Sequence, residues 1–218
     1  MIPPRILVVF LLMGGIALAQ TPSPGTVSSD APSGDAPKYP PGLYAMIDTS
    51  VGVITAQLFE KETPVTVRAF VGLARGTQPW LDPKTRKQAT HPLYENLIFH
   101  RVIPDFMIQT GDPTGTGGYN PGFKLPDEFV DSLKFDRPGR LAMANAGPKT
   151  ADSQFFITED KYPAGNGHYA IFGQVVDGQR LVAKISHVIR DSHDRPTAPT
   201  KLIKITFLRI PGEAAPAN

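Results

Sequence analysis

Short apolar runs, separated by glycine and proline, constrain the fold of this chain more than any other feature. Its 218 residues include 20 glycines and 23 prolines, and after residue 19 the apolar runs between them are only a few residues long. Such runs suit strands better than helices, because a helix needs a longer periodic segment. Between residues 53 and 58 the side chains alternate between two faces, with Ile54, Ala56 and Leu58 on the apolar one. The sequence therefore predicts a mainly β fold.

Eight strands and two helices are predicted, beginning with a β-hairpin across residues 44–59. Thr63 can cap a helix that has Pro64 at its first position and ends at Gly76, and a second helix is expected at residues 179–186. Because closure removes exposed strand edges, this set predicts a closed eight-stranded antiparallel β-barrel capped by two α-helices. The other strands are expected at 97–103, 106–111, 141–146, 154–158, 171–176 and 202–210, with a surface loop at 76–92.

The first 19 residues have the composition of a cleaved secretion signal. Arg5 precedes an apolar run, and Ala17 and Ala19 are the small residues that a signal peptidase reads. The alternative is a retained membrane anchor, but the run falls short of the ~20 apolar residues of a spanning helix. We therefore expect an exported protein, periplasmic or secreted, with no stable membrane insertion after cleavage.

The rest of the chain is expected to be one domain with flexible ends. Residues 20–42 consist almost wholly of Pro, Ser, Thr, Gly, Ala and Asp, which predicts a disordered linker before a domain at 43–210 and a flexible tail at 211–218. The chain has no cysteine, so the core must hold without disulfides. Loss of Arg5 with the signal leaves 21 basic and 20 acidic side chains, without a basic cluster, which argues against nucleic acid as a partner.

The densest motif is the run YENLIFHRVIPDFMIQTG, from Tyr94 to Gly111. It resembles the signature of the cyclophilin family of peptidyl-prolyl cis/trans isomerases. The resemblance covers residues 44–210 and implies a monomeric enzyme that isomerises X-Pro bonds in unfolded or flexible polypeptides, during the folding of exported proteins. Further blocks that resemble the same family, in the same order, are Gly115–Gly118, Asp127–Phe129, Met143–Pro148 and Ser153–Phe156.

The resemblance also implies roles for individual residues. Arg101, Gln109 and Phe106 would be catalytic, with the Arg101 guanidinium donating to the prolyl nitrogen as the amide twists and that nitrogen gains a lone pair. The alternative for Arg101 is a buried salt bridge with an Asp or Glu. Residues implied to bind substrate are Met107, Gly115, Ala144, Asn145, Ala146, Gln154, Phe156 and Tyr169, with the Asn145 main chain pairing with the residue before proline.

Strand periodicity indicates which of these side chains share a face. His100 is expected on the face opposite Arg101, as a hydrogen-bonded structural histidine. For the apolar residues the alternative is an ordinary core, and Phe99 is assigned to it. The pairs expected to share a face are Phe99 with Arg101, Met107 with Gln109, and Gln154 with Phe156. Their convergence on one groove is implied by the resemblance and not by the spacing.

Other functions have weaker support. A phosphate loop at 111–118 lacks the following Lys-Ser/Thr, and the five histidines show no ligand spacing, so neither a cofactor nor a metal is expected. A cyclophilin-like module that binds peptides or acts as a chaperone without catalysis remains an alternative, although it has little need for Arg101.

Four positions depart from the family pattern. Thr110 replaces a smaller residue beside Gln109, and Tyr169 replaces a histidine of eukaryotic members. At the groove rim Ala164 and Gly165 stand where many members have a large aromatic residue followed by Leu, although nearby Tyr162 can shift this register. The loss of the rim aromatic predicts isomerase activity with poor inhibition by cyclosporin.

Overall fold

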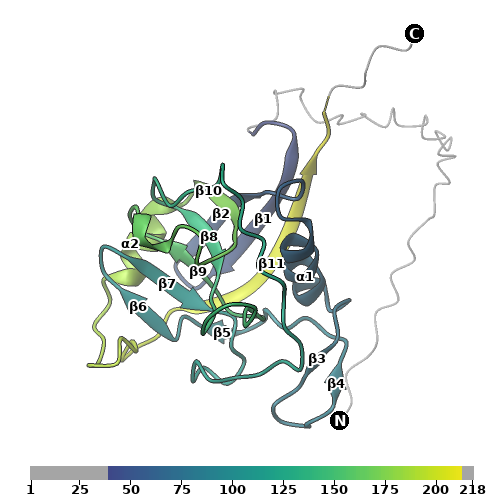
Figure 1. Ribbon diagram of the computed structural model, residues 1–218. Helices are drawn as coiled ribbons and strands as arrows, with labels where there is room; N and C mark the ends of the chain where they lie inside the picture. The colour runs from purple at the N-terminus through teal and green to yellow at the C-terminus, as the bar shows by residue number, and fades with distance from the viewer. Residues whose placement is uncertain (1–38, 213–218) are drawn as a thin grey trace, which may run out of the picture. The chain divides into compact units, whose positions relative to one another are not determined.

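The computed structural model describes residues 39–212 (Figure 1). The predicted signal at 1–19, most of the linker at 20–42 and most of the tail at 211–218 lie outside these residues. No helix between residues 39 and 212 is long and apolar enough to cross a membrane. The elements are β1 (Gly42–Thr49), β2 (Gly52–Leu58), α1 (Pro64–Arg75), β3 (Trp80–Leu81), β4 (Gln88–Ala89), β5 (Leu97–Ile98), β6 (Arg101–Ile103), β7 (Met107–Thr110), β8 (Arg140–Met143), β9 (Phe155–Thr158), the 3₁₀ turn Pro163–Gly165, β10 (Ile171–Asp177), α2 (Gln179–Ser186) and β11 (Lys201–Ile210).

Nine of these strands form one curled antiparallel sheet, in the order β5-β11-β1-β2-β10-β8-β9-β7-β6. Its two edge strands, β5 and β6, come from the single segment 97–103. The Phe99 amide donates to the Thr200 carbonyl on one side, at 3.0 Å, and the His100 amide donates to the Gln109 carbonyl on the other, at 3.1 Å. The predicted mainly antiparallel β fold with two helices is confirmed. The sheet is a curled half-barrel of nine strands and not of the predicted eight, because the expected strand at 97–103 is divided into β5 and β6.

The expected strand at 97–103 is interrupted at Phe99 and His100, and this changes which side chains share a face. Phe99 and Val102 are fully buried in the core, whereas His100 and Arg101 both line the same cavity. The expectations that Phe99 lies with Arg101 and that His100 faces away from it were therefore wrong. Side chains alternate only within a continuous strand, and the chain leaves one neighbour for another at this point.

Thr110 is also turned away from the groove. It is fully buried, and its hydroxyl donates to the Ile98 carbonyl at 2.9 Å, which ties β7 to the segment at the sheet edge. The departure from the family pattern at this position therefore affects the junction behind the groove and not the groove floor.

Helix α1 starts and ends where predicted, but its cap differs from the expected one. The Thr63 hydroxyl donates to the Phe59 carbonyl, and the amides of Val65 and Thr66 donate to the Glu128 carboxylate at 3.1 and 2.7 Å. A carboxylate at this end also suits the helix dipole. At the other end Gly76 adopts a φ of 75°, as expected for a glycine that ends a helix.

The main core lies between the sheet and α1. Phe70 projects from the helix between Tyr94, Phe155 and Phe172, with ring centroids 5.3, 5.2 and 4.9 Å away. Helix α2 packs on the opposite side of the fold, against β2, β6 and β7 (Figure 1). The predicted loop at 76–92 contains the short pair β3–β4 and buries Trp80.

Candidate active site

Strand register aligns the central residues of the site across four neighbouring strands. Arg101 on β6 lies opposite Gln109 on β7, Gln109 lies opposite Phe156 on β9, and Phe156 lies opposite Ala142 on β8. Residues directly opposite each other in antiparallel strands project from the same face. The sheet therefore presents a guanidinium, an amide and an aromatic ring side by side.

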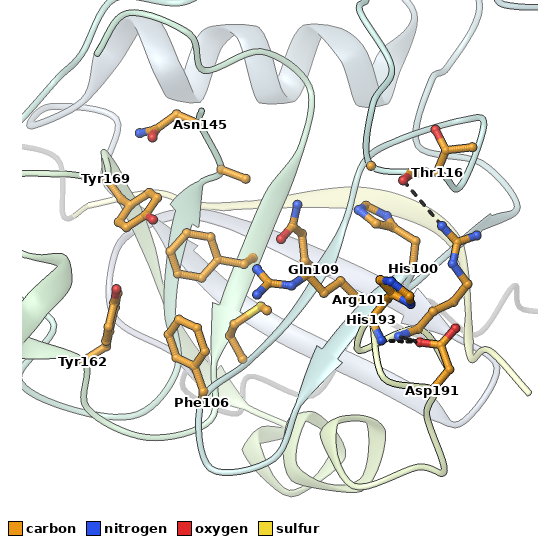
Figure 2. A pocket seen from close by; sticks show the side chains of 15 residues that line it. His100, Arg101, Phe106, Gln109, Thr116, Asn145, Tyr162, Tyr169, Asp191 and His193 are labelled. Carbon is orange, nitrogen blue, oxygen red and sulfur yellow. Dashed lines mark hydrogen bonds between the residues drawn. The ribbon is translucent and has the colours of Figure 1, made fainter. Parts of the chain in front are cut away.

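These side chains line a cavity of about 720 Å³ (Figure 2). Met107 and Phe156 form its buried apolar part, being 1% and 4% exposed. Of the residues predicted from the sequence, the cavity brings together Arg101, Phe106, Met107, Gln109, Ala144, Asn145, Phe156 and Tyr169. The predicted convergence of these faces is therefore present in the structure.

An aromatic cluster encloses the apolar end of the cavity. The ring centroids of Phe106 and Tyr162 lie 4.5 Å apart. The Phe156 and Tyr169 rings meet edge to face, with their centroids 5.2 Å apart. Phe135, fully buried, stacks behind Phe156 at 5.9 Å. Sequence reasoning missed Phe135, because a single aromatic residue in a turn-rich segment looks like ordinary core.

Tyr162 occupies the space that a larger residue at position 165 would fill. A Cβ atom added to Gly165 would lie 2.5 Å from the Tyr162 ring and 3.1 Å from the Phe135 ring. Ala164 instead lines a neighbouring cavity of about 390 Å³, which it shares with Phe129 and Asn145 among others. Tyr162 is thus a wall of the apolar pocket, and it also lines this neighbouring cavity together with Ala164.

Arg101 forms an ion pair with Asp194, with its Nε atom 3.5 Å from Oδ2. The two side chains are 45% and 30% exposed, so this is not the buried salt bridge that was the alternative for Arg101. The Asp194 carbonyl also accepts from the Val102 amide at 2.9 Å, which ties its loop to β6. No recorded hydrogen bond within residues 39–212 engages the two terminal nitrogens of the Arg101 guanidinium.

The side-chain amides of Gln109 and Gln154 are linked by hydrogen bonds beneath the groove. Gln109 Nε2 donates to Gln154 Oε1 at 3.0 Å, and Gln154 Nε2 donates to the Gly117 carbonyl at 3.1 Å. Gln154 is 7% exposed, so its position suits the predicted orienting role. Gly115 is not among the residues that line the cavities beside Gln109, whereas Gly117 lines both of them. A Cβ atom added to Gly115 would lie 2.9 Å from the Ile98 side chain, so this predicted binding residue lies against Ile98 and away from the groove.

Asp112 shapes the loop that contains Gly117. Its carboxylate accepts from the amides of Thr114, Thr116 and Gly117 at 2.6, 3.1 and 2.6 Å, and from the Thr114 hydroxyl at 2.6 Å. Burial alone would raise the pKa of Asp112, but the hydrogen bonds from Thr114 and Gly117 hold it below its usual value. The charged form of Asp112 therefore stabilises this side of the groove.

Asn145 presents its main chain to the groove. Its side chain is used internally, because Nδ2 donates to the His168 carbonyl at 2.7 Å and Oδ1 accepts from the Gly147 amide at 3.2 Å. Within the described residues, no recorded hydrogen bond uses the Asn145 main-chain N–H or carbonyl. Small neighbours, Ala144 and Ala146, leave space for an extended peptide beside it.

Sequence reasoning missed one whole wall of the cavity. The loop between α2 and β11 contributes Asp191, His193 and Arg195, far in the sequence from Arg101. On the floor beside them lies His100, whose two ring nitrogens have no hydrogen-bond partner within residues 39–212; the amide of nearby Gln154 is already used. Because its ring nitrogens lack partners, His100 is not the hydrogen-bonded histidine that was expected; its burial lowers its pKa.

One group of possible metal ligands lies outside the cavity. Ligand atoms of Asp105, Glu159 and His187 lie within 4.8 Å of one another. The Glu159 carboxylate is already used, since it accepts from the Asp105 amide at 2.8 Å and from Ser186, and Oε1 lies 2.9 Å from His187 Nε2. This group joins the β6–β7 turn to the end of α2.

A curled antiparallel sheet with an apolar pocket beside an exposed guanidinium suits an enzyme that twists prolyl peptide bonds. Residues 44–207 match the family described as "Cyclophilin type peptidyl-prolyl cis-trans isomerase/CLD". The chain belongs to this family and is a peptidyl-prolyl cis-trans isomerase. The match favours an enzyme over a module that only binds peptides.

Named relatives agree with this assignment. The chain is 49% identical over 165 residues to peptidyl-prolyl cis-trans isomerase A of Mycobacterium tuberculosis, covering 75% of this chain and 91% of the relative. It is 48% identical to peptidyl-prolyl cis-trans isomerase B of Streptomyces anulatus, over 66% and 83% of the two chains. A Cryptosporidium parvum cyclophilin solved in the presence of the dipeptide Ala-Pro has a TM-score of 0.66 and 32% identity, over 77% and 99% of the chains.

Proposed function

We propose that this isomerase accelerates X-Pro isomerisation while exported proteins fold, and that Arg101 is its principal catalytic residue. Export is suggested by the signal-like residues 1–19, and the position of Arg101 beside the apolar pocket supports its role. This proximity is the observation on which the proposal rests. The crystal structure of the Cryptosporidium relative, solved in the presence of Ala-Pro, is consistent with a proline-binding pocket.

The proposed mechanism needs no covalent chemistry. A proline ring lies among Phe106, Met107 and Phe156, and the Asn145 main chain pairs with the preceding residue. The planar amide resists rotation with a barrier of roughly 18 to 20 kcal/mol. As the bond twists, the prolyl nitrogen gains a lone pair, to which a terminal nitrogen of Arg101 donates. This donation is stronger in the transition state than in the planar ground state, so the barrier falls.

Gln109 and Gln154 keep the polar side of the groove fixed. Because each amide is held by a hydrogen bond to the next group, substrate binding does not have to order them. Gln109 would contact the substrate backbone, and Gln154 would act by orienting Gln109.

The mechanism is tested by replacing Arg101 with Ala. We expect kcat/KM to fall at least about tenfold while peptide affinity changes less, since the lost interaction belongs to the transition state. Arg180→Ala, an exposed arginine outside the cavity, is the matched control. An unchanged rate in a folded Arg101→Ala variant would assign catalysis to other groups.

Export is tested separately by the intact mass of the protein recovered from outside the cytoplasm. The mature chain is expected to begin at Gln20. A mass that retains residues 1–19 would contradict cleavage and favour a membrane anchor.

A further inference from the structure

The cavity continues beyond Arg101 into a polar arm, which isomerisation of the prolyl bond does not itself require. We use this name for the part lined by Thr116, Asp191, His193 and Arg195. In Figure 2 the labelled members of the arm lie on one side of Arg101, and the aromatic pocket with Asn145 lies on the other. An extended peptide with its proline in the pocket would therefore continue along the same cavity toward the arm.

Arg195 is the least engaged charged group of the arm. Its exposed guanidinium has one recorded hydrogen bond, from Nη2 to the Thr116 carbonyl at 3.4 Å, and no ion pair within residues 39–212. The nearby Asp191 carboxylate is used by the main chain, because Oδ1 accepts from the amides of His193 and Arg195 at 2.8 and 3.0 Å. Arg195 can therefore donate to a ligand without breaking a salt bridge.

The other charges around the arm are largely compensated. Asp194 lies between two arginines, 3.5 Å from Arg101 Nε and 3.4 Å from Arg190 Nε. Burial and the guanidinium groups of Arg195 and Arg101 lower the pKa of His100 on the floor, and they outweigh the Asp112 carboxylate, which raises it, so His100 is mainly neutral at pH 7. Arg195 therefore offers a ligand a positive charge that no ion pair in the described part of the chain engages, and the nearby Asp191 carboxylate attracts it electrostatically.

The direction of the bound chain decides which substrate residue reaches this charge. In the proposed function, the residue before proline pairs with the Asn145 main chain, at the opposite end of the cavity from the arm (Figure 2). The chain that follows proline then runs past Arg101 toward Arg195.

We propose that the polar arm is a subsite for a carboxylate, and that the enzyme prefers X-Pro bonds followed within two residues by Asp or Glu. Arginine is well suited to this ligand, because its planar guanidinium matches the geometry of a carboxylate. The inference rests on the proposed binding orientation and deepens it by naming a substrate class.

The test compares peptides that are identical except for Glu or Gln at the first or second position after proline. Isomerisation is measured by exchange NMR, so that no coupling protease can select among them. Because the pair is partly exposed, we expect kcat/KM to be about two- to fivefold higher for the Glu peptide at low salt, and the difference to shrink in high salt. Arg195→Gln should bring the Glu/Gln ratio close to one, whereas the control Arg180→Gln should preserve it.

Charge reversal gives a second, independent measurement. Arg195→Glu should disfavour the Glu peptide and favour a Lys peptide, which a general loss of structure would not produce. Equal rates for the Glu and Gln peptides with the unmodified enzyme would overturn the proposed subsite. The proposal would also fail if Glu placed before proline raised kcat/KM as much as Glu placed after it. Absence of catalysis on every peptide would instead contradict the isomerase function itself.

Discussion

Arg101 and Asp194 form a half-exposed ion pair that joins strand β6 to the loop between α2 and β11. Nε of Arg101 lies 3.5 Å from Oδ2 of Asp194, and the Asp194 carbonyl accepts from the neighbouring Val102 amide. Asp194 therefore restrains the guanidinium through Nε, while no hydrogen bond within residues 39–212 engages its terminal nitrogens. We infer that Asp194 is a positioning residue for Arg101.

Replacing Asp194 with Asn should lower kcat/KM about three- to tenfold, mainly through kcat, because a less ordered donor is less often aligned with the twisted amide. Steady-state kinetics provide the measurement, and Asp194→Glu should recover part of the rate. In an Arg101→Ala background the Asp194→Asn change should have little further effect. Full additivity of the two losses would show that Asp194 acts independently of Arg101.

Cyclosporin should inhibit the enzyme weakly. The Ala164 side chain supplies neither the flat apolar surface nor the donor of a rim tryptophan, and this loss costs about 2 kcal/mol of affinity. Ala164→Trp should strengthen inhibition, measured as the concentration that halves isomerase activity. Tyr162 packs in the wall of the apolar pocket and also lines the neighbouring cavity that contains Ala164. Nanomolar inhibition of the unmodified protein would assign the anchoring role to Tyr162 or another residue.

Gly165→Ala should destabilise the protein by about 1–3 kcal/mol, because the new methyl group would overlap the ring of Tyr162 in a packed aromatic cluster. Denaturant unfolding provides the measurement. Gly118→Ala is the matched control, since a Cβ there meets nothing closer than Thr116 Oγ1 at 3.9 Å. Equal stability of the two variants would mean that Tyr162 leaves its place at little cost.

The stabilising contribution of Asp112 to its loop should be lost at acid pH. The pKa of Asp112 is lowered in the folded state, so its contribution is complete above the unfolded value near 3.8 and is lost as pH falls through the lower folded value. Asp112→Asn should cost about 1–3 kcal/mol at pH 7, because several amide donors lose a charged acceptor. The difference between wild type and variant, measured by denaturant unfolding, should shrink below pH 4. A difference that is constant with pH would exclude this titration.

Removal of metal ions should leave isomerase activity unchanged. The proposed mechanism uses only a guanidinium and a shaped pocket, and the Glu159 carboxylate of the Asp105–Glu159–His187 group is already hydrogen-bonded. Activity is compared before and after treatment with EDTA and gel filtration. A loss that Zn²⁺ restores would show that this group holds a metal.

Local features of the sequence were sufficient to predict most of the elements. Helix α1 follows from Pro64, Gly76 and the apolar spacing between them, and the first hairpin follows from its alternation and turn. These signals are readable because they act between residues only a few positions apart. The central site residues came from the motif that resembles the cyclophilins, and the structure brings most of them into one cavity.

The features that the sequence did not predict depend on contacts between segments that are distant in the chain. The interruption at Phe99 and His100 arises because one segment pairs with β11 and then with β7, and no local pattern records a change of partner. Asp194 and Arg195 lie in a loop without regular structure, and only the closure of the sheet brings them beside Arg101. Periodicity thus determined the elements of this protein, whereas tertiary packing decided which charged side chains meet at the groove.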